Sequence, residues 1–220
     1  MSAFLKSLFA TPILVGQSDD RQMAREISEL AYQFKANAKE ALLVSSAWNE
    51  QKRSSDRSDF DQEGVTSYGT QAGLFTRPEW AKAGQFIQQL AHTMLATVDH
   101  AGRQLRFGGM WTTVYPQGAF IPIHTHPNSI LSGVYYALAE EGCGGIEFED
   151  LSWVTKTMHM HPDPRSFPST PTKHIEEAVT GKMVIFPGWL PHSSLPNQSG
   201  VDRIIVSFNM EFHDQPSQPS

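Results

Sequence analysis

The chain has 220 residues, of which 40% are hydrophobic and 10% aromatic, which is enough for one substantial core and too short for two large domains. Its formal net charge of −6 at pH 7, without a basic stripe, argues against a nucleic-acid partner. No apolar run approaches the length of a membrane-spanning helix, so no membrane partner is expected. The single cysteine, Cys143, excludes an internal disulfide and favours a reducing compartment, from which we expect a cytoplasmic protein.

The first half of the chain is predicted to be mainly helical. A first strand is expected at residues 8–15, followed by a helix over 18–39 that begins with capping Ser and Asp residues. Residues 45–64 are polar and lack a clear period, which predicts a loop. After a short strand at 65–68, a second helix is expected from residue 76 to about residue 100.

The second half changes to short strands separated by Gly and Pro turns. These strands are predicted at residues 105–115, 120–126, 130–138, 145–149, 175–179, 182–186 and 201–212. Helices followed by strands indicate an α+β fold that is predominantly β, specifically a double-stranded β-helix or jelly roll buttressed by the two helices. We expect a single domain over 1–220, with the helical buttress mainly at 18–103, the β core mainly at 105–213, and a disordered tail at 214–220.

Two histidines in the predicted strand 120–126 suggest a metal site. Side chains alternate between the faces of a strand, so His124 and His126 are expected to point the same way and to reach one ion together. His192, which follows the predicted strand 182–186 and the Pro187-Gly188 turn, is the best candidate for a third ligand. Imidazole suits iron, zinc, copper or nickel, so the histidines alone do not identify the metal.

The spacing of these residues resembles the two metal-binding stretches of the cupin superfamily. The first stretch is Gly118 followed after five residues by His124 and then His126, and the second runs from Gly181 through Pro187-Gly188 to His192. The glutamate that cupins commonly carry shortly after the histidine pair is absent at Ile130 and Leu131.

A resemblance to the Fe(II)- and 2-oxoglutarate-dependent dioxygenases extends over more of the chain. Tyr115-Pro-Gln-Gly118 and Val134-Tyr-Tyr136 resemble the prolyl-hydroxylase-like branch, and Arg203 follows His192 on the last predicted strand. The chain is most similar to a bacterial family of 2-oxoglutarate/Fe(II) oxygenases of unassigned substrate. The matching pieces are residues 8–12, 124–129, 131–136, 186–192 and 203–209.

This resemblance implies a cofactor, a cosubstrate and roles for particular residues. Fe(II) would be held by His124 and His192, and 2-oxoglutarate would bind as cosubstrate with its distal carboxylate on Arg203. Tyr115 and Tyr136 would be hydrogen-bond partners of the cosubstrate. The implied reaction is hydroxylation of a C–H bond of an unidentified substrate with release of succinate and CO2, and the metal centre alone would perform the chemistry.

His126 departs from the usual pattern of the resembled enzymes, most of which have Asp or Glu at this position. A third histidine would make the ligand set neutral. An alternative is that Asp150 supplies the carboxylate, or else Glu147; strand alternation places these two on opposite faces, so at most one could point inward.

The remaining pocket residues follow from alternation along two strands. Trp111 and Thr113 share a face with Tyr115, and Ser207 and Asn209 share a face with Arg203, so all four are expected to line the pocket.

Other functions fit the same residues. One is a three-histidine cupin metalloenzyme that does not use 2-oxoglutarate, and another is a non-catalytic jelly roll that binds a ligand and retains a metal. The substrate is expected to be a small molecule or a peptide. A homodimer is compatible with the sequence. The segments 45–64 and 158–171 show no pattern that indicates a function. The pair His159 and His161 has no evident third partner, and we interpret it as part of a solvated or substrate-facing segment.

Overall fold

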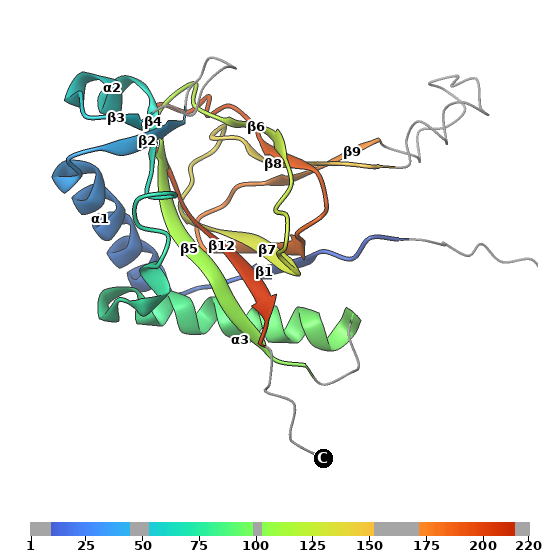
Figure 1. Cartoon of the computed structure of the whole chain (residues 1–220). Helices are drawn as coiled ribbons and strands as arrows, with labels where there is room; N and C mark the ends of the chain where they lie inside the picture. The colour runs from blue at the N-terminus through green and yellow to red at the C-terminus, as the bar shows by residue number, and fades with distance from the viewer. Residues whose placement is uncertain (1–9, 45–52, 99–102, 152–171, 214–220) are drawn as a thin grey trace, which may run out of the picture.

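Two antiparallel sheets pack against each other to form the body of the protein (Figure 1). The computed structural model describes residues 10–44, 53–98, 103–151 and 172–213, and the following account is confined to them. Both sheets are antiparallel and helices cover one side, which confirms the predicted jelly roll with its helical buttress.

The larger sheet has eight strands and contains most of the chain's long strands. Its order is β1 (Leu14–Gln17), β10 (Lys182–Pro187), β7 (Leu131–Leu138), β12 (Arg203–Phe212), β5 (Leu105–Tyr115), β4 (Gly64–Thr66), β2 (Ala41–Val44) and β3 (Arg53–Ser54). The central strand β12 pairs with β5 along its whole length, from Arg203 opposite Tyr115 to Phe212 opposite Leu105.

The smaller sheet has four strands, in the order β6 (Ile121–His124), β11 (His192–Ser194), β8 (Gly145–Glu149) and β9 (Lys173–Glu177). Strand β11 was not predicted from the sequence, because three residues are too few to show a period. It pairs with β6 on one side and with β8 on the other, and so joins the two halves of this sheet.

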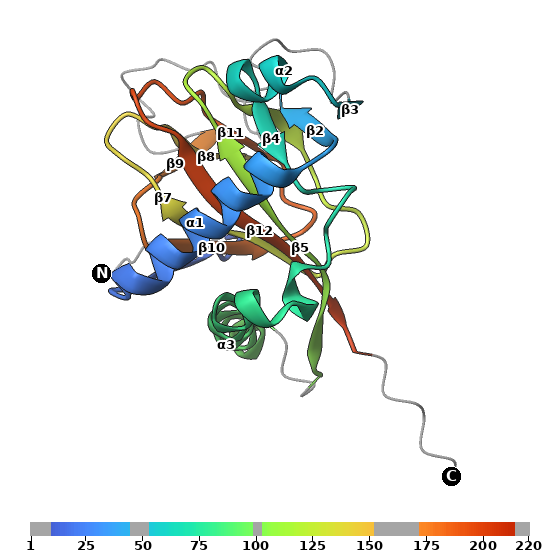
Figure 2. The ribbon, with the colours of Figure 1, turned by 90° about the vertical axis from the view of Figure 1, so that its left-hand side faces the viewer.

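Two long helices lie against the outer face of the larger sheet (Figure 2). Helix α1 (Arg21–Asn37) begins at Asp20, whose side chain accepts a hydrogen bond from the Met23 backbone N–H at 2.8 Å. Helix α3 (Ala81–Val98) follows two short 3₁₀ turns, η1 (Leu74–Thr76) and η2 (Pro78–Trp80). Both helices bury apolar side chains at helical spacing, namely Met23, Ile27, Ala31, Ala83, Ile87, Ala91 and Met94.

The prediction of a loop over 45–64 was wrong for its described part. Residues 53–54 form β3, and α2 (Arg57–Gln62) follows, capped by the Asp56 side chain, which accepts from Ser58 N at 2.9 Å. This helix is too short to show a period and is anchored by one buried ring, Phe60. Residues 45–52 of the predicted loop, the start of the predicted first strand, segment 158–171 with His159 and His161, and the tail 214–220 lie outside the described residues.

Alternation along the strands separates two apolar cores. On β12, Ile204, Val206 and Phe208 pack under the helices, whereas Ile205 faces the smaller sheet. The inner core lies between the sheets and contains aromatic residues from both, including Phe148 and Phe186. The side chains of Arg203 and Ser207 share the inner face with Ile205, so β12 delivers polar groups between the sheets.

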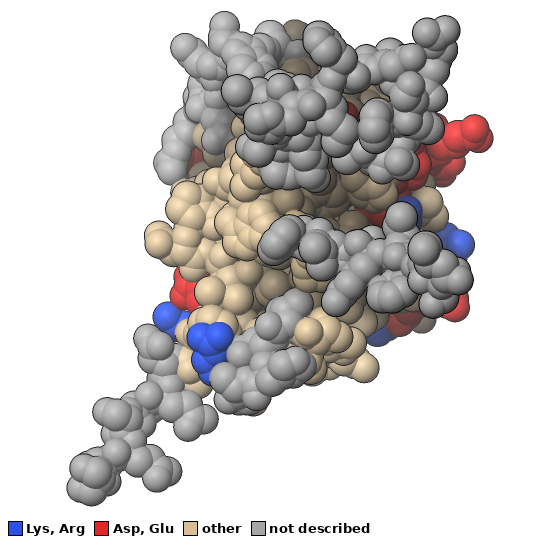
Figure 3. All heavy atoms as spheres, turned by 90° about the vertical axis from the view of Figure 1, so that its right-hand side faces the viewer, with Lys and Arg blue, Asp and Glu red and all other residues tan. Residues whose placement is uncertain are grey.

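The described surface is largely uncharged on one face. Figure 3 shows the side of the molecule that lies to the right in Figure 1, where charged side chains lie toward the margins of the described surface. Among the helices of the described residues, none has the length and hydropathy needed to cross a bilayer.

Candidate metal centre

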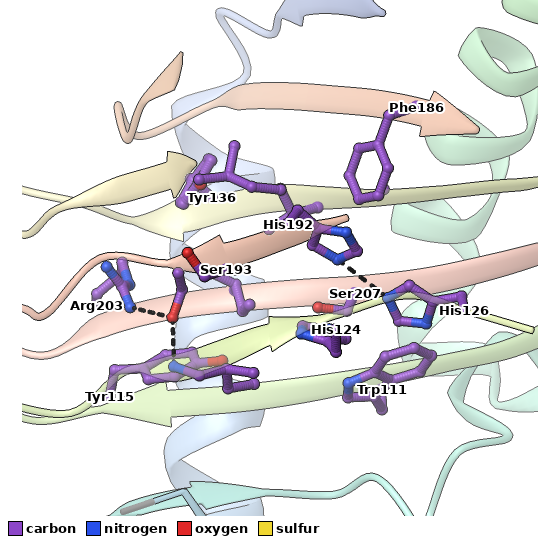
Figure 4. Close-up of a pocket in the computed structure, with 16 residues that line it drawn as sticks. Trp111, Tyr115, His124, His126, Tyr136, Phe186, His192, Ser193, Arg203 and Ser207 are labelled. Atoms are coloured by element: carbon purple, nitrogen blue, oxygen red, sulfur yellow. Dashed lines mark hydrogen bonds between the residues drawn. The ribbon is translucent and has the colours of Figure 1, made fainter. Parts of the chain in front are cut away.

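Three histidines meet between the sheets (Figure 4). One ring nitrogen from each of His124, His126 and His192 lies within 4.8 Å of the others. His124 and His192 are cross-strand partners in β6 and β11, with ring centroids 4.4 Å apart. The Nε2 atoms of His126 and His192 are separated by 3.2 Å. The structure therefore brings together the three histidines that the sequence predicted.

Hydrogen bonds to backbone carbonyls orient two of these rings. Nδ1 of His124 is 2.8 Å from the Pro122 carbonyl oxygen, and Nδ1 of His192 is 2.8 Å from the Leu190 carbonyl oxygen. A carbonyl oxygen only accepts, so each Nδ1 must carry the proton and donate it. In the neutral ring, Nε2 is then left with a lone pair, which is the protonation state that a metal ligand needs.

Burial keeps these imidazoles neutral. Loss of solvation lowers the pKa of His124, lowers that of His126 to about 4, and lowers that of His192 to about 3. The proximity of the other imidazoles lowers the pKa values of His126 and His192 further. At neutral pH, three uncharged nitrogen donors converge on one point, a ligand set that suits iron as well as other transition metals.

His126 does not lie in the strand where it was expected, because β6 ends at His124. Its backbone N–H donates to the Gly188 carbonyl at 2.8 Å, in the turn that leads to His192. The residues that follow form a turn in which Ser129 N–H donates to the His126 carbonyl and Asn128 has a φ of 67°. The position of His126 is thus set by a tertiary hydrogen bond instead of strand alternation.

The two acidic residues considered as alternatives are not part of this group of ligand atoms. Glu147 of β8 pairs at 2.7 Å with Lys173 of the edge strand β9. The Asp150 backbone N–H donates to the Thr172 carbonyl at 2.9 Å, beyond the end of β8. The geometry favours the three-histidine set over a set that includes either carboxylate.

Arg203 lies in the same inner cavity as the histidines and is 1% exposed. The cavity has a volume of about 70 Å³. The guanidinium donates to the carbonyl oxygens of Cys143 and Leu195, the latter at 2.8 Å, and lies over the Tyr115 ring at 4.5 Å. Among the described residues no carboxylate pairs with it, so it is a buried cation without a counter-ion.

Two predicted tyrosines and one serine that was not predicted lie near this guanidinium. Tyr115 and Tyr136 are both buried and line the cavity, and burial raises the pKa of Tyr115 to about 12 and raises that of Tyr136. Ser194 was missed by the sequence analysis. Its hydroxyl accepts from the Ile121 backbone N–H at 2.7 Å and from Arg203 at 3.3 Å. No sequence signal marks it, because it belongs to the unpredicted strand β11.

The four residues that were expected to line the pocket do not all lie in the same cavity. Trp111 and Ser207 line the inner cavity as predicted. Thr113 lines neither this cavity nor the one beside it, because its hydroxyl donates to Thr66 at 2.8 Å within the sheet. Asn209 lines the neighbouring cavity.

Residues 109–209 match the model of a protein family described as "Putative 2OG-Fe(II) oxygenase". The matched segment contains the three histidines and Arg203. A search of curated protein sequences finds no match.

Solved structures with a similar fold have low sequence identity to this chain. A prolyl-4-hydroxylase of Pseudomonas putida is 15% identical, with a TM-score of 0.56 over 93% of this chain and 94% of that one. The alpha-ketoglutarate-dependent epimerase SnoN from nogalamycin biosynthesis is 12% identical, with a TM-score of 0.61 over 91% and 76%. HygX from Streptomyces hygroscopicus, solved with nickel and 2-oxoglutarate bound, is 10% identical, with a TM-score of 0.53 over 91% and 83%. At these identities the likeness shows a shared fold.

Proposed function

We propose, from the match of residues 109–209 to this family model, that the chain is a 2-oxoglutarate/Fe(II) oxygenase that hydroxylates a C–H bond of a small substrate. The reaction would consume 2-oxoglutarate and O2 and release succinate and CO2. Hydroxylation is a more specific claim than oxygenase chemistry in general, because an epimerase has a similar fold.

The donor set fits an iron ion. His124, His126 and His192 would hold it through nitrogen atoms that are neutral at pH 7, and two of these rings are oriented by their carbonyl partners. The bound metal would supply activation of O2 and oxidation of the substrate.

The observation that carries the proposal is the buried cation of Arg203 in the cavity that also contains the histidines. A buried charge is costly unless an opposite charge accompanies it, so this cavity favours an anionic ligand. The distal carboxylate of 2-oxoglutarate meets this requirement, because the planar guanidinium can donate two parallel hydrogen bonds to it. A metal site without 2-oxoglutarate leaves this cation unexplained.

The other residues of the cavity would position the cosubstrate and exclude water. Ser194 and Tyr115 lie beside the guanidinium and offer hydroxyl groups to the same carboxylate. The apolar wall, formed by Val134, Ile146 and Phe186 among others, keeps the local dielectric constant low, which strengthens the ion pair.

The test consists of three measurements on the purified protein. We expect iron to bind at one ion per chain, 2-oxoglutarate to bind to the metal-loaded protein, and succinate to form slowly under air without added substrate. A His174→Ala variant, which removes an exposed histidine paired with Glu176, should behave like the wild type. A protein that binds iron but neither binds 2-oxoglutarate nor releases succinate would contradict the proposal.

A further inference from the structure

A second cavity borders the histidine cluster on the side away from Arg203. Its volume is about 300 Å³, at the lower end of the range of sites for small molecules. Four residues belong to the walls of both cavities, and they are Trp111, Ile121, His124 and His126. A ligand in this outer cavity would therefore lie directly beside the proposed metal position.

The two cavities differ in charge. Arg203 lines the inner cavity, whereas the described residues that line the outer one include no Asp, Glu, Lys or Arg. A charged ligand would lose its hydration in the outer cavity without gaining a partner of opposite charge from these residues.

Aromatic and other apolar side chains form much of the outer cavity. The rings of Tyr68 and Trp111 are in contact, with centroids 4.9 Å apart, and Trp111 in turn lies 6.2 Å from the His126 ring. Tyr68 is 46% exposed, so one face of its ring-bearing side chain is open to a ligand or to solvent. Ile121, Ile123, Pro122 and Pro127 also line this cavity.

One polar group of the outer cavity retains a donor for a ligand. The Ser132 hydroxyl donates to Asn209 Oδ1 at 2.6 Å, which fixes the orientation of the amide. The NH₂ group of Asn209 has no protein acceptor among the described residues. The hydroxyl of Thr66, another polar residue of this wall, already bonds to Thr113 at 2.8 Å and to the Tyr68 backbone N–H at 3.2 Å.

We propose that the outer cavity binds the substrate, and that this substrate is a small uncharged molecule with a ring and a hydrogen-bond acceptor. The ring would pack on Tyr68 and Trp111, and the acceptor would take the hydrogen bond of the Asn209 NH₂ group. The assignment of this ligand as the substrate rests on the proposed function, since it assumes oxidation at the neighbouring metal. The two cavities would then sort the anionic cosubstrate from the neutral substrate by charge.

The test uses protein loaded with Zn(II) and 2-oxoglutarate and three probes with the same ring. These are 4-methylbenzamide, which is uncharged, 4-methylbenzylamine, which is a cation, and 4-methylbenzenesulfonate, an anion that is a weak metal ligand. Affinities are measured by ligand-observed NMR. We expect the amide to bind at least about tenfold more tightly than either charged probe.

Variants locate the binding to the outer cavity. Tyr68→Ala should weaken amide binding about tenfold by removing the exposed ring, whereas Tyr32→Ala, on a similarly exposed tyrosine of α1, should leave it unchanged. Asn209→Asp retains the acceptor for Ser132 but adds a negative charge, so it should weaken the amide and strengthen the amine. Affinity for 2-oxoglutarate should be unchanged in Tyr68→Ala.

Equal affinities for the three probes, no binding of the amide, or no effect of Tyr68→Ala would overturn the inference. If the protein failed to bind iron and 2-oxoglutarate but bound the amide in a Tyr68-dependent manner, the proposed function would fall and the ligand class of the outer cavity would stand. The two failures are therefore distinguishable.

Discussion

His124 and His192 are direct partners across strands β6 and β11, and this register brings their imidazole rings to a centroid separation of 4.4 Å. Residues directly opposite each other in an antiparallel pair project to the same face of the sheet. His192 is also opposite Phe148 of β8, whose ring lies 6.2 Å away. The interior strand β11 thus holds His192 between His124 on one side and the apolar ring of Phe148 on the other.

Replacement of Arg203 by Lys should weaken 2-oxoglutarate binding while metal affinity stays the same. Lysine keeps the charge but loses the planar fork, and the loss of one charge-assisted hydrogen bond corresponds to about a 10- to 100-fold increase in Kd. Calorimetric titration of the metal-loaded protein measures this change. Arg106→Lys, at an exposed arginine that pairs with Glu211 at 3.1 Å, is the matched control. Unchanged affinity in Arg203→Lys would remove Arg203 from the cosubstrate site.

Removal of the His126 imidazole should lower metal affinity. On the scale of structural zinc sites, about 10 kcal/mol shared by four ligands corresponds to roughly 2–3 kcal/mol each, so His126→Ala should bind metal about 30- to 150-fold more weakly. His126→Asp should retain binding and shift preference toward Mn(II) and away from Cu(II), because a carboxylate is a harder ligand. Competition with a chelator measures both variants. If His126→Ala bound metal as the wild type does, a set of three histidines would be wrong.

The absence of a side chain at Gly144 leaves room for the Arg203 guanidinium. Gly142, which has the same backbone conformation but no close neighbour, allows this effect to be distinguished from backbone strain. Gly142 and Gly144 both have a φ of 79°, so an alanine at either position should cost about 1–2 kcal/mol of folding free energy. A Cβ at Gly144 would also lie 2.9 Å from Arg203 Nη1 and 2.8 Å from the Leu195 carbonyl, whereas a Cβ at Gly142 would meet nothing within 4 Å.

We therefore expect both alanine variants to lower the melting temperature, and only Gly144→Ala to weaken 2-oxoglutarate binding as well. Thermal unfolding and calorimetric titration provide the two measurements. Equal cosubstrate affinity in the two variants would show that the close approach of Gly144 to Arg203 has no functional effect.

Asp20 should stabilise the fold in a pH-dependent way. Its carboxylate caps α1 and pairs with Lys82 at 2.7 Å, and chiefly this hydrogen bond to Lys82 holds its pKa below the ordinary 3.8. A lowered pKa means that the stabilisation is fully present above 3.8 and is lost as the pH falls through the lower, folded-state pKa.

At pH 7, Asp20→Ala should lower the melting temperature by about 2–4 °C, and the difference from the wild type should shrink on acidification below the ordinary pKa. Asp19→Ala removes a neighbouring exposed charge that makes no side-chain cap and is the control. A difference that stays constant down to acid pH would mean that the carboxylate charge does not contribute.

Several features of the fold and the site were predictable because they depend on local periodicity. Strand β5 occupies 105–115 as expected, and alternation along β12 correctly placed Arg203 and Ser207 on one inward face. The same rule failed for Thr113, which has the expected position in its strand but bonds to Thr66 of the adjacent strand β4. Contacts with a neighbouring strand depend on pairing, which a single strand's pattern does not contain.

The amino-acid sequence by itself determined which residues are candidates for the site, because three histidines and one arginine in this order favour a metal and an anion as ligands. Only the tertiary structure decided how they meet. His126 lies beyond the end of its strand, and its backbone hydrogen bond to Gly188 brings its ring within 3.2 Å of His192. Its partner is 62 residues away, so the contact exists only when the two sheets have formed and their register is set.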